Sequence, residues 1–266
     1  MDVFEQSKLE NDAYDHWKSF VHEITYKNRF FPQHPIVELF QSYTENHFFT
    51  LPKGTILYRA RIIDYDSPSA ESTGIVKGSI CHQEYGAFEG FDEMNSFTPP
   101  PESASSGRAN PEKVVYLYTA SEIVTAIAET RPRLLDHISV AKIELQCDLR
   151  IVDLRVESSS LKIDYSSLIV RNLIASFSHP CKGPIEYIPT QFIAEYTKSL
   201  GFDGIAYHSS FIFGGTNITL FHPSQAKAVA SSPYRLDNVV YRARRIAPIR
   251  KLDEFDIIAT NANMHR

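Results

Sequence analysis

The sequence predicts an α+β protein made of one large domain and a helical N-terminal annex. Apolar residues recur at helical spacing near the N-terminus, and the remainder mixes short strand-like and helical stretches without regular β–α–β alternation. The length of 266 residues is enough to bury a sizeable core without disulfides or a structural metal. We expect the annex over residues 1–50, the main domain over 51–250 and a C-terminal tail over 251–266.

The annex carries an amphipathic stripe, because apolar residues from Phe4 to Ile24 recur at spacings of three to five. The stretch Phe31–Pro35 contains two prolines and interrupts this helix. A second helix follows and is marked by Ile36, Leu39, Phe40 and Tyr43. The stripe has to be buried, so we expect these helices to pack on the core or on a partner.

The first strand is expected at Thr55–Ile63, after a Pro–Gly turn at Leu51–Gly54. The residues that follow, 64–113, are rich in Ser, Gly, Pro and acidic residues and show no clear periodicity. So long a stretch indicates an inserted segment that is either a functional loop or a disordered one.

Regular structure returns at Val114–Tyr118, which is typical of a buried strand. Thr119–Glu122 then has the capping-box pattern T-x-x-E, which predicts a helix that ends at Pro132. Gly201 is expected to be the C-cap of a later helix. Apolar patterning predicts strands at Val140–Leu145, Ile151–Leu154, Gly204–Ser210, Thr216–Phe221 and Val239–Ile246, and helices at Leu168–Phe177 and Thr190–Leu200.

The charge balance argues against a general polyanion binder. Lys and Arg number 27 against 32 Asp and Glu, which gives a net charge of −5, whereas nucleic-acid affinity rests largely on phosphate neutralisation. We therefore expect no direct nucleic-acid partner. No apolar run approaches the length of a membrane span and the first residues are polar, so the sequence predicts no membrane association and a cytoplasmic location.

Common metal and nucleotide motifs do not occur in the sequence. The three cysteines, Cys81, Cys147 and Cys181, are far apart, and the ten histidines include no H-E-x-x-H pair. The patterns G-x-x-x-x-G-K-[ST], G-x-G-x-x-G and G-x-S-x-G do not occur either. The sequence thus predicts neither a metal site nor a bound cofactor.

A scattered set of polar residues remains. Arg59 and Arg61 share one face of the first strand by its two-residue period, and Glu129 lies on the next predicted helix. Arginines that converge with one carboxylate can clamp a diphosphate while the carboxylate faces a sugar. Each of these residues taken alone is more typical of a surface ion pair or a solvated helix face.

Together and in this order, the polar segments resemble the RES domain family, which is named for its Arg, Glu and Ser. The resemblance extends over about residues 50–225 and is densest between 107 and 132. It rests on Leu57-Tyr-Arg-Ala-Arg61, Gly107-Arg-Ala-Asn-Pro111, Val115-Tyr-Leu-Tyr-Thr-Ala-Ser121, Ala126-Ile-Ala-Glu-Thr-Arg-Pro132, Tyr187-Ile-Pro-Thr-Gln191, Gly201-Phe-Asp-Gly-Ile-Ala-Tyr-His-Ser-Ser210 and Gly214-Gly-Thr-Asn217.

The resemblance implies both a fold and an activity. The fold is that of ADP-ribosyltransferase toxins, with two small β-sheets around an NAD cleft. The activity is cleavage of the nicotinamide–ribose bond of NAD, with phosphate or water as acceptor, which in toxin–antitoxin members depletes cellular NAD. NAD is then a substrate rather than a cofactor, and inorganic phosphate is the co-substrate when it is the acceptor.

Carried over by motif, the family's catalytic Arg, Glu and Ser fall on Arg59, Glu129 and Ser209, with Ser210 as the competitor for the serine. The arginines would hold phosphate groups, the tyrosines would contact nicotinamide, and the hydroxyl and amide side chains would bind ribose or carboxamide. The substrate contacts expected on this basis are Tyr58, Arg61, Arg108, Tyr118, Ser210 and Asn217. Arg242 competes with Arg59, because Val240–Arg245 echoes the Y-R-A-R segment of the first strand.

The chain departs from the small RES toxins in three ways: Ala109 replaces a large aromatic, and both the annex and the 64–106 insert are additional. The annex is expected to cover the cleft, bind a partner such as an antitoxin, or form a homo-oligomer. Two alternatives to NAD cleavage stay open. One is an ADP-ribosyltransferase that modifies a macromolecule, and the other is a non-catalytic binding module.

Overall fold

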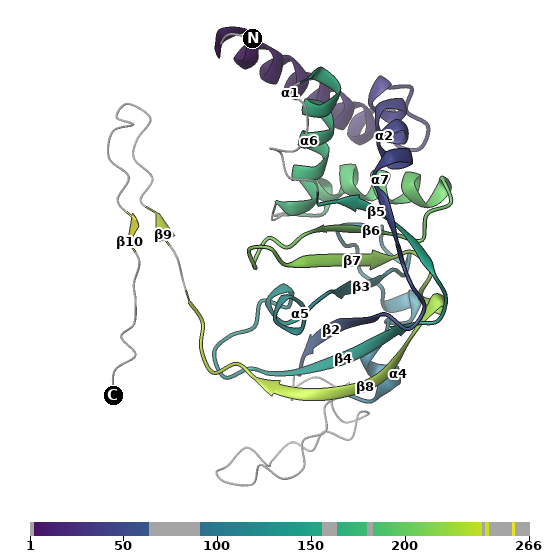
Figure 1. The fold of residues 1–266 in the computed structure, drawn as a ribbon, viewed down its shortest axis with the longest axis vertical. Helices are drawn as coiled ribbons and strands as arrows, with labels where there is room; N and C mark the ends of the chain where they lie inside the picture. The colour runs from purple at the N-terminus through teal and green to yellow at the C-terminus, as the bar shows by residue number, and fades with distance from the viewer. Residues whose placement is uncertain are drawn as a thin grey trace.

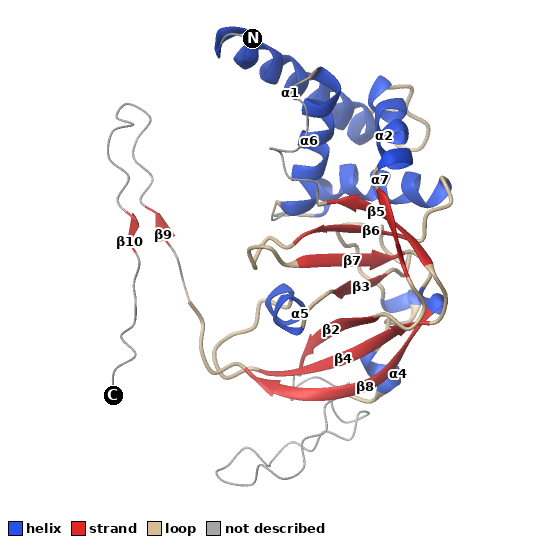
Figure 2. Cartoon of the chain, in the orientation of Figure 1, coloured by secondary structure: helices blue, strands red, loops and turns tan. Residues whose placement is uncertain are grey.

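The computed structural model of the protein describes residues 3–63, 91–155, 164–179, 183–240, 243–244 and 257–258. An eight-stranded sheet with parallel and antiparallel pairs forms its centre, and helices gather beyond one end of the sheet (Figures 1 and 2). The predicted α+β class is confirmed. From edge to edge the sheet contains β1 (Phe48–Leu51), β5 (Leu149–Leu154), β6 (Gly204–His208), β7 (Thr216–Leu220), β3 (Leu117–Ala120), β2 (Ile56–Ile62), β4 (His137–Leu145) and β8 (Ala226–Arg235).

The sheet is split between β2 and β3. These two strands pair only at Tyr58 and Ala120, whereas β2 pairs with β4 along its whole length and β3 pairs with β7 likewise. One half therefore contains β1, β5, β6, β7 and β3, and the other contains β2, β4 and β8. This arrangement matches the two small sheets that the family resemblance implied.

Four helices pack together beyond the β5 and β6 end of the sheet (Figure 1). Phe20, Phe40 and Phe177 are fully buried in their common core, which also contains Val152 of β5 and Ile205 of β6. The two N-terminal helices predicted from the apolar stripe are confirmed, and the first packs against the last two in this group. The four helices are α1 (Val3–Tyr26), α2 (Pro35–Asn46), α6 (Tyr165–Ser178) and α7 (Ile188–Ser199).

A second core lies among the strands and contains Leu57, Leu117, Ile143 and Leu220. The short helices are α4 (Glu93–Ser96), α5 (Ile123–Glu129), η1 (Pro101–Ser103), η2 (Pro184–Tyr187) and η3 (Pro223–Gln225). Of these, α5 contacts both β2 and β3 and so lies where the two half-sheets meet (Figure 2). Two-residue strands β9 (Ala243–Arg244) and β10 (Ile257–Ile258) form an antiparallel pair of their own.

The capping-box prediction was wrong. Thr119 belongs to β3, where its hydroxyl donates to the carbonyl of Ile218, and the N-cap of α5 is Glu122 without a side-chain capping bond. The β3–β7 pairing extends the strand to Ala120, so Thr119 is used by the sheet and not by the helix. In contrast, Gly201 follows α7 with a φ of +83°, as expected for a residue that ends a helix.

Strand β8 was missed, and the strand predicted at Val239–Ile246 is not confirmed in the described part of that range. Val239 and Val240 lie outside any strand, and only Ala243–Arg244 is extended, in β9. The Ser-Ser-Pro sequence that ends at Pro233 is typical of a turn, but pairing with β4 keeps β8 extended there. Proline is tolerated because β8 is the edge strand.

Candidate functional site

A pocket of about 310 Å³ opens where the sheet is split. This volume lies at the lower end of the range for small-molecule sites. Both half-sheets and α5 contribute to its walls, so the pocket depends on the gap between β2 and β3. It is lined by Tyr58, Arg59, Ala60, Tyr118, Thr119, Ala120, Ala126, Glu129, Thr130, Tyr207 and Asn217.

Glu129 is the carboxylate of this pocket. It is the last residue of α5, and its Oε1 accepts two hydrogen bonds, from Ser209 Oγ at 2.7 Å and from Asn217 Nδ2 at 2.6 Å. No Lys or Arg forms a salt bridge with it among the described residues. The carboxylate is therefore oriented by neutral donors and is not paired with a side-chain cation in the described part of the chain.

Ser209 and Ser210 point in different directions. The hydroxyl of Ser209 donates to Glu129 and accepts from the backbone N–H groups of Phe211 and Ile212. The hydroxyl of Ser210 donates instead to the carbonyl of Ser178 at the end of α6. The structure thus brings Ser209, and not Ser210, to the carboxylate.

Arg59 is a partly buried cation without a carboxylate partner in the described part of the chain. Its Nη1 donates to the carbonyl of Tyr118 at 3.3 Å, and its Nε is buried with no hydrogen-bond partner. Burial, together with the positive charge of Arg61, lowers the pKa of Arg59 to about 10. It is still protonated at neutral pH, so the pocket contains a desolvated positive charge with donor capacity to spare.

Arg61 lies on the same face of β2 but has a different environment. Its guanidinium stacks over the Phe91 ring at 4.7 Å and donates to the carbonyl of Asn95. It does not line the pocket. The shared face predicted from strand periodicity is correct, but local partners take the side chain away from Arg59.

Tyr118 lines the pocket, but its hydroxyl is used elsewhere. The oxygen accepts from the backbone N–H of Ala109 at 2.8 Å and donates to Asn110 Oδ1 at 2.6 Å. Burial raises the pKa of Tyr118, so the hydroxyl stays neutral. Gly107 is required here, because a Cβ on it would lie 2.6 Å from Asn110 Oδ1 and 2.7 Å from the Tyr118 oxygen.

The 106–110 segment is held by α7. Buried Gln191 donates through Nε2 to Ser106 Oγ and to the carbonyls of Gly107 and Asn110. Its Oε1 accepts from Arg29, which lies between α1 and α2, at 2.9 Å. The annex and the segment that binds the Tyr118 hydroxyl therefore meet at one glutamine, within the segment Tyr187–Gln191 that the family resemblance had marked.

Arg108 does not line the pocket. Its Nη1 donates to the carbonyls of Ser176 and His179 at the C-terminal end of α6, at 3.2 and 2.8 Å. A cation at this position also interacts favourably with the negative end of the helix dipole. Its role in substrate binding stays a prediction, whereas its contact with α6 is a feature of the fold.

Tyr207 is the largest pocket residue that sequence reasoning missed. It is 4% exposed, and burial raises its pKa to about 12, so its hydroxyl is neutral at physiological pH. The signal was present in the strand period, since Ser209 directly follows β6 and lies two residues after Tyr207, and residues two apart in an extended chain face the same side. Thr130, which directly follows Glu129 at the end of α5, also lines the pocket and was not predicted.

Comparison with known proteins identifies the family, since the RES domain family matches residues 80–238, well over half of the chain. The chain belongs to the RES domain family. No curated protein matches it. A crystal structure of the M. tuberculosis MbcT–MbcA toxin–antitoxin complex is similar at 11% identity and a TM-score of 0.41, covering 75% of this chain and 91% of that one.

The RES domain match includes Glu129 and Ser209 but begins after β2. Arg59 therefore lies outside the matched residues, and the pocket is what associates it with the RES domain. Ala109, where the chain departs from the small RES toxins, is fully buried in the core that the N-terminal helices share. Arg242, the competitor for Arg59, lies outside the described residues.

Neither a metal-binding cluster nor a membrane-spanning helix occurs in the part of the chain that the structure describes. No group of three or more His, Cys, Asp and Glu side chains is placed to hold a metal ion there. No helix in the described ranges is long and apolar enough to cross a bilayer.

Proposed function

We propose that this RES domain protein cleaves the nicotinamide–ribose bond of NAD, with phosphate or water as the acceptor. The supporting observation is that Glu129 and Arg59 line the same pocket without forming a salt bridge with each other. In the described part of the chain, Glu129 is an oriented carboxylate without a counter-ion, and Arg59 is a partly buried cation without one. NAD offers groups of opposite charge to these two residues. Its diphosphate is anionic and suits Arg59, and its ribose becomes cationic as the bond breaks and suits Glu129.

Glu129 acts on the ribose in this proposal. Loss of nicotinamide leaves an oxocarbenium-like sugar, and a nearby carboxylate stabilises its positive charge, as in glycoside cleavage. Such stabilisation is largest when the charged group is already oriented before the reaction. Ser209 and Asn217 supply this orientation by donating to Oε1, so that the carboxylate does not need to rearrange.

Arg59 acts on the diphosphate. Its Nε has lost its hydration without gaining a hydrogen-bond partner, and its Nη1 donates only to the Tyr118 carbonyl, so a bound anion would replace part of the lost solvation. Arginine suits this role because its planar donors match phosphate oxygens in a bidentate manner.

Tyr58, Tyr118 and Tyr207 provide aromatic surface for the nicotinamide ring. Tyr118 and Tyr207 have raised pKa values because they are buried, so they contribute neutral rings rather than acids or bases. The nicotinamide ring of NAD is already cationic and becomes neutral when its bond to ribose breaks, so the protein does not need to protonate it. The absence of a strong acid from the proposed mechanism is thus consistent with the chemistry of the leaving group.

In the cell, we propose that this activity depletes NAD and makes the protein a toxin or defence effector of the cytoplasm. Membership of the RES domain family supports this role, because the family includes toxins of toxin–antitoxin systems. A cognate antitoxin is then the expected partner.

The test is to incubate the purified full-length protein with NAD, with and without phosphate, and to identify the products by chromatography and mass spectrometry. ADP-ribose 1″-phosphate with phosphate present indicates phosphorolysis, and ADP-ribose indicates hydrolysis. A mass increase on an added protein would indicate macromolecular transfer instead. The absence of nicotinamide release by folded protein under every condition would overturn the proposal.

A further inference from the structure

We propose that His208 is a positioning residue for this site: from the opposite face of β6 it fixes Ser209, and through Ser209 it fixes Glu129. The proposal rests on the proposed function, because it assigns a role in NAD cleavage. His208 neither lines the pocket nor belongs to the residues that the family resemblance marked as catalytic. Its neighbours on both sides do face the pocket region, since Tyr207 lines the pocket and Ser209 binds Glu129.

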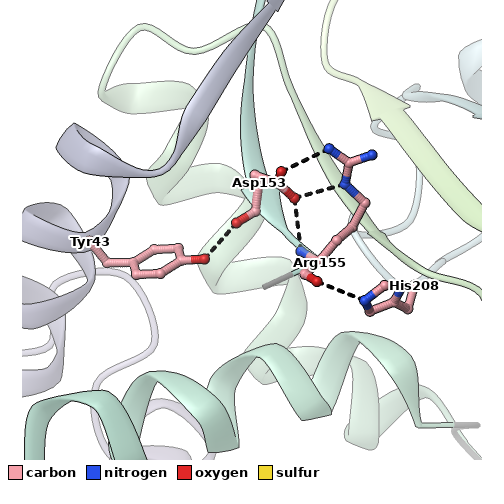
Figure 3. Close-up of polar contacts among 4 residues, drawn as sticks. All are labelled: Tyr43, Asp153, Arg155 and His208. Carbon is pink, nitrogen blue, oxygen red and sulfur yellow. Dashed lines mark hydrogen bonds and ion pairs between the residues drawn. The ribbon is translucent and has the colours of Figure 1, made fainter. Parts of the chain in front are cut away.

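The His208 side chain prolongs the pairing of β5 and β6 beyond its last backbone pair. The parallel ladder ends at Leu154 and Tyr207. One residue further on, His208 Nε2 lies 2.7 Å from the carbonyl oxygen of Arg155 (Figure 3). A carbonyl oxygen only accepts hydrogen bonds, so the Nε2 atom carries the proton and donates.

Ser209 is thereby held on two sides. Its own backbone N–H donates to the carbonyl of Gly215, which comes just before β7. The residue before it is tied to the end of β5 through the Arg155 carbonyl. Without the histidine bond, the end of β6 would lose its tie to β5 and would keep its backbone bonds to the β7 side and the hydroxyl bonds of Ser209 and Ser210.

The acceptor of this bond is itself fixed. Asp153 accepts from Arg155 through the backbone N–H at 2.9 Å and through Nε and Nη2 at 2.8 Å each (Figure 3). Burial raises the pKa of Asp153, but the hydrogen bonds from Arg155 outweigh burial and hold the pKa below its usual value. The carboxylate is therefore charged, and it sets the conformation of Arg155 whose carbonyl receives His208.

The series of contacts that leads to Ser209 begins at α2 and the residue that follows it. Tyr43 Oη donates to the main-chain carbonyl of Asp153 at 2.6 Å (Figure 3). The Asp153 N–H donates to the carbonyl of His47 at 2.9 Å. Tyr43 is 6% exposed, and burial raises its pKa, so it remains a donor at physiological pH. The annex therefore holds β5 at the residue from which the contacts to Ser209 begin.

The proposal is tested with His208→Leu and His208→Gln, each made in the wild-type protein and in a Ser209→Ala variant. Gln keeps an N–H donor near the position of Nε2, whereas Leu removes it. His222→Leu is the matched control, because His222 is exposed and follows β7 without a side-chain capping bond. For each variant, kcat and KM for NAD are measured together with the melting temperature.

We expect His208→Leu to lower kcat about tenfold while KM changes less than about twofold, because a small displacement of a catalytic group chiefly affects the chemical step. His208→Gln should recover most of kcat, and His222→Leu should leave it unchanged. In the Ser209→Ala background, His208→Leu should lower kcat by less than about twofold, since residues that act through one another are not additive.

Equal losses from His208→Leu in both backgrounds would overturn the proposal, because His208 would then act independently of Ser209. A Gln variant as impaired as the Leu variant would also overturn it. Failure of the proposed function looks different, since the wild-type protein itself would then release no nicotinamide. In that case, hydrogen–deuterium exchange of residues 204–215 tests whether His208 fixes the backbone at Ser209. Unchanged exchange of these residues in His208→Leu would refute that claim.

Discussion

The hydroxyl of Ser209 donates a hydrogen bond to Glu129 Oε1 at 2.7 Å, across 80 positions of the chain. Asn217 donates to the same oxygen at 2.6 Å from β7. Two neutral donors on one carboxylate oxygen orient it without neutralising it, which is the property that charge stabilisation at a sugar requires.

Glu129→Gln should lower kcat for NAD cleavage by about 10²–10³, because the amide keeps the size of the side chain but lacks the negative charge. The Gln carbonyl oxygen can still accept from Ser209 and Asn217, so the fold should be unaffected. Glu122→Gln is the matched control, since Glu122 is exposed at the start of the same helix and makes no side-chain capping bond. Steady-state kinetics of nicotinamide release checks both variants, and equal loss in both would refute the role of Glu129.

Ser209→Ala and Ser210→Ala should behave differently. Loss of the Ser209 hydroxyl removes one of the two donors that orient Glu129, and we expect kcat to fall about tenfold, the equivalent of one net hydrogen bond to a charged group. Loss of the Ser210 hydroxyl removes a bond to the end of α6, so stability should fall by about 1 kcal/mol while kcat changes little. The ratio of the two kcat values and urea unfolding measure this contrast, and a reversed ratio would assign the serine role to Ser210.

Arg59→Met should weaken NAD binding and yet leave the ligand-free protein as stable as the wild type or more stable. Arg59 has a buried Nε without a hydrogen-bond partner and no carboxylate partner among the described residues, so the fold does not recover its desolvation cost, which an apolar side chain of similar length avoids. Isothermal titration calorimetry with NAD and thermal unfolding without NAD measure the two effects. Unchanged NAD affinity in the Met variant would show that Arg59 does not bind the substrate.

Arg61→Met is the comparison for the same strand face. Its guanidinium already stacks on Phe91 and donates to Asn95, so its loss should lower stability and change NAD affinity by less than about threefold. If Arg61→Met weakens NAD binding as strongly as Arg59→Met, both arginines serve the substrate, as the sequence alone had suggested.

Gly107→Ala should destabilise the protein by about 1–3 kcal/mol, because the new Cβ would lie under 3 Å from Asn110 Oδ1 and from the Tyr118 hydroxyl. Gly183→Ala is the matched control, since nothing lies within 4 Å of a Cβ at that position and its φ is −164°. Chemical unfolding measures both. A neutral Gly107→Ala variant would mean that Tyr118 is not fixed by the 107–110 segment.

Stability should fall as the pH drops below about 6.5, partly through His34. His34 Nδ1 accepts from the N–H of Ile36 and so caps α2, which a ring protonated on that atom cannot do. Burial chiefly, and the nearby His16, lower the pKa of His34, while Glu23 opposes them. The unfolded chain then binds more protons than the folded one as the pH falls, so the stability present above the unfolded pKa is lost below it.

His34→Asn checks the contribution of His34 to this pH dependence. Asparagine is a good N-cap that does not titrate, so the loss of unfolding free energy between pH 7.5 and 5.5 should be smaller in the variant than in the wild type. Identical pH profiles for both proteins would remove His34 from the explanation.

Periodicity predicted the local elements well where one face of an element is buried. The apolar stripe of residues 4–24 predicted α1, because Trp17, Phe20 and Ile24 of that stripe are buried. The turn at Leu51–Gly54 and the strand-like composition of Thr55–Ile63 predicted β2. Prediction failed where hydrogen bonding to a strand distant in sequence determines the local structure. Thr119 looks like a helix cap but belongs to β3, and Pro233 looks like a turn residue but belongs to edge strand β8.

The candidate site was predictable in its residue types more than in its contacts. The pocket brings together Arg59, Glu129 and Asn217, with Ser209 bound to Glu129. Strand parity could not show that Arg61 turns to Phe91 or that Arg108 turns to the end of α6. Those outcomes depend on acceptors supplied by distant segments, which a local pattern does not contain.

The single residue pair between β2 and β3 has a consequence for how ligands can be detected. A molecule in the pocket would contact residues of both half-sheets. It would thereby connect β2 and β3, whose backbones pair at one position only. Occupancy then favours the folded state by mass action, and the melting temperature rises with the logarithm of ligand concentration above the dissociation constant. Thermal-shift titration of the catalytically impaired Glu129→Gln protein thereby becomes a screen for unconverted substrates, independent of any assumption about the acceptor.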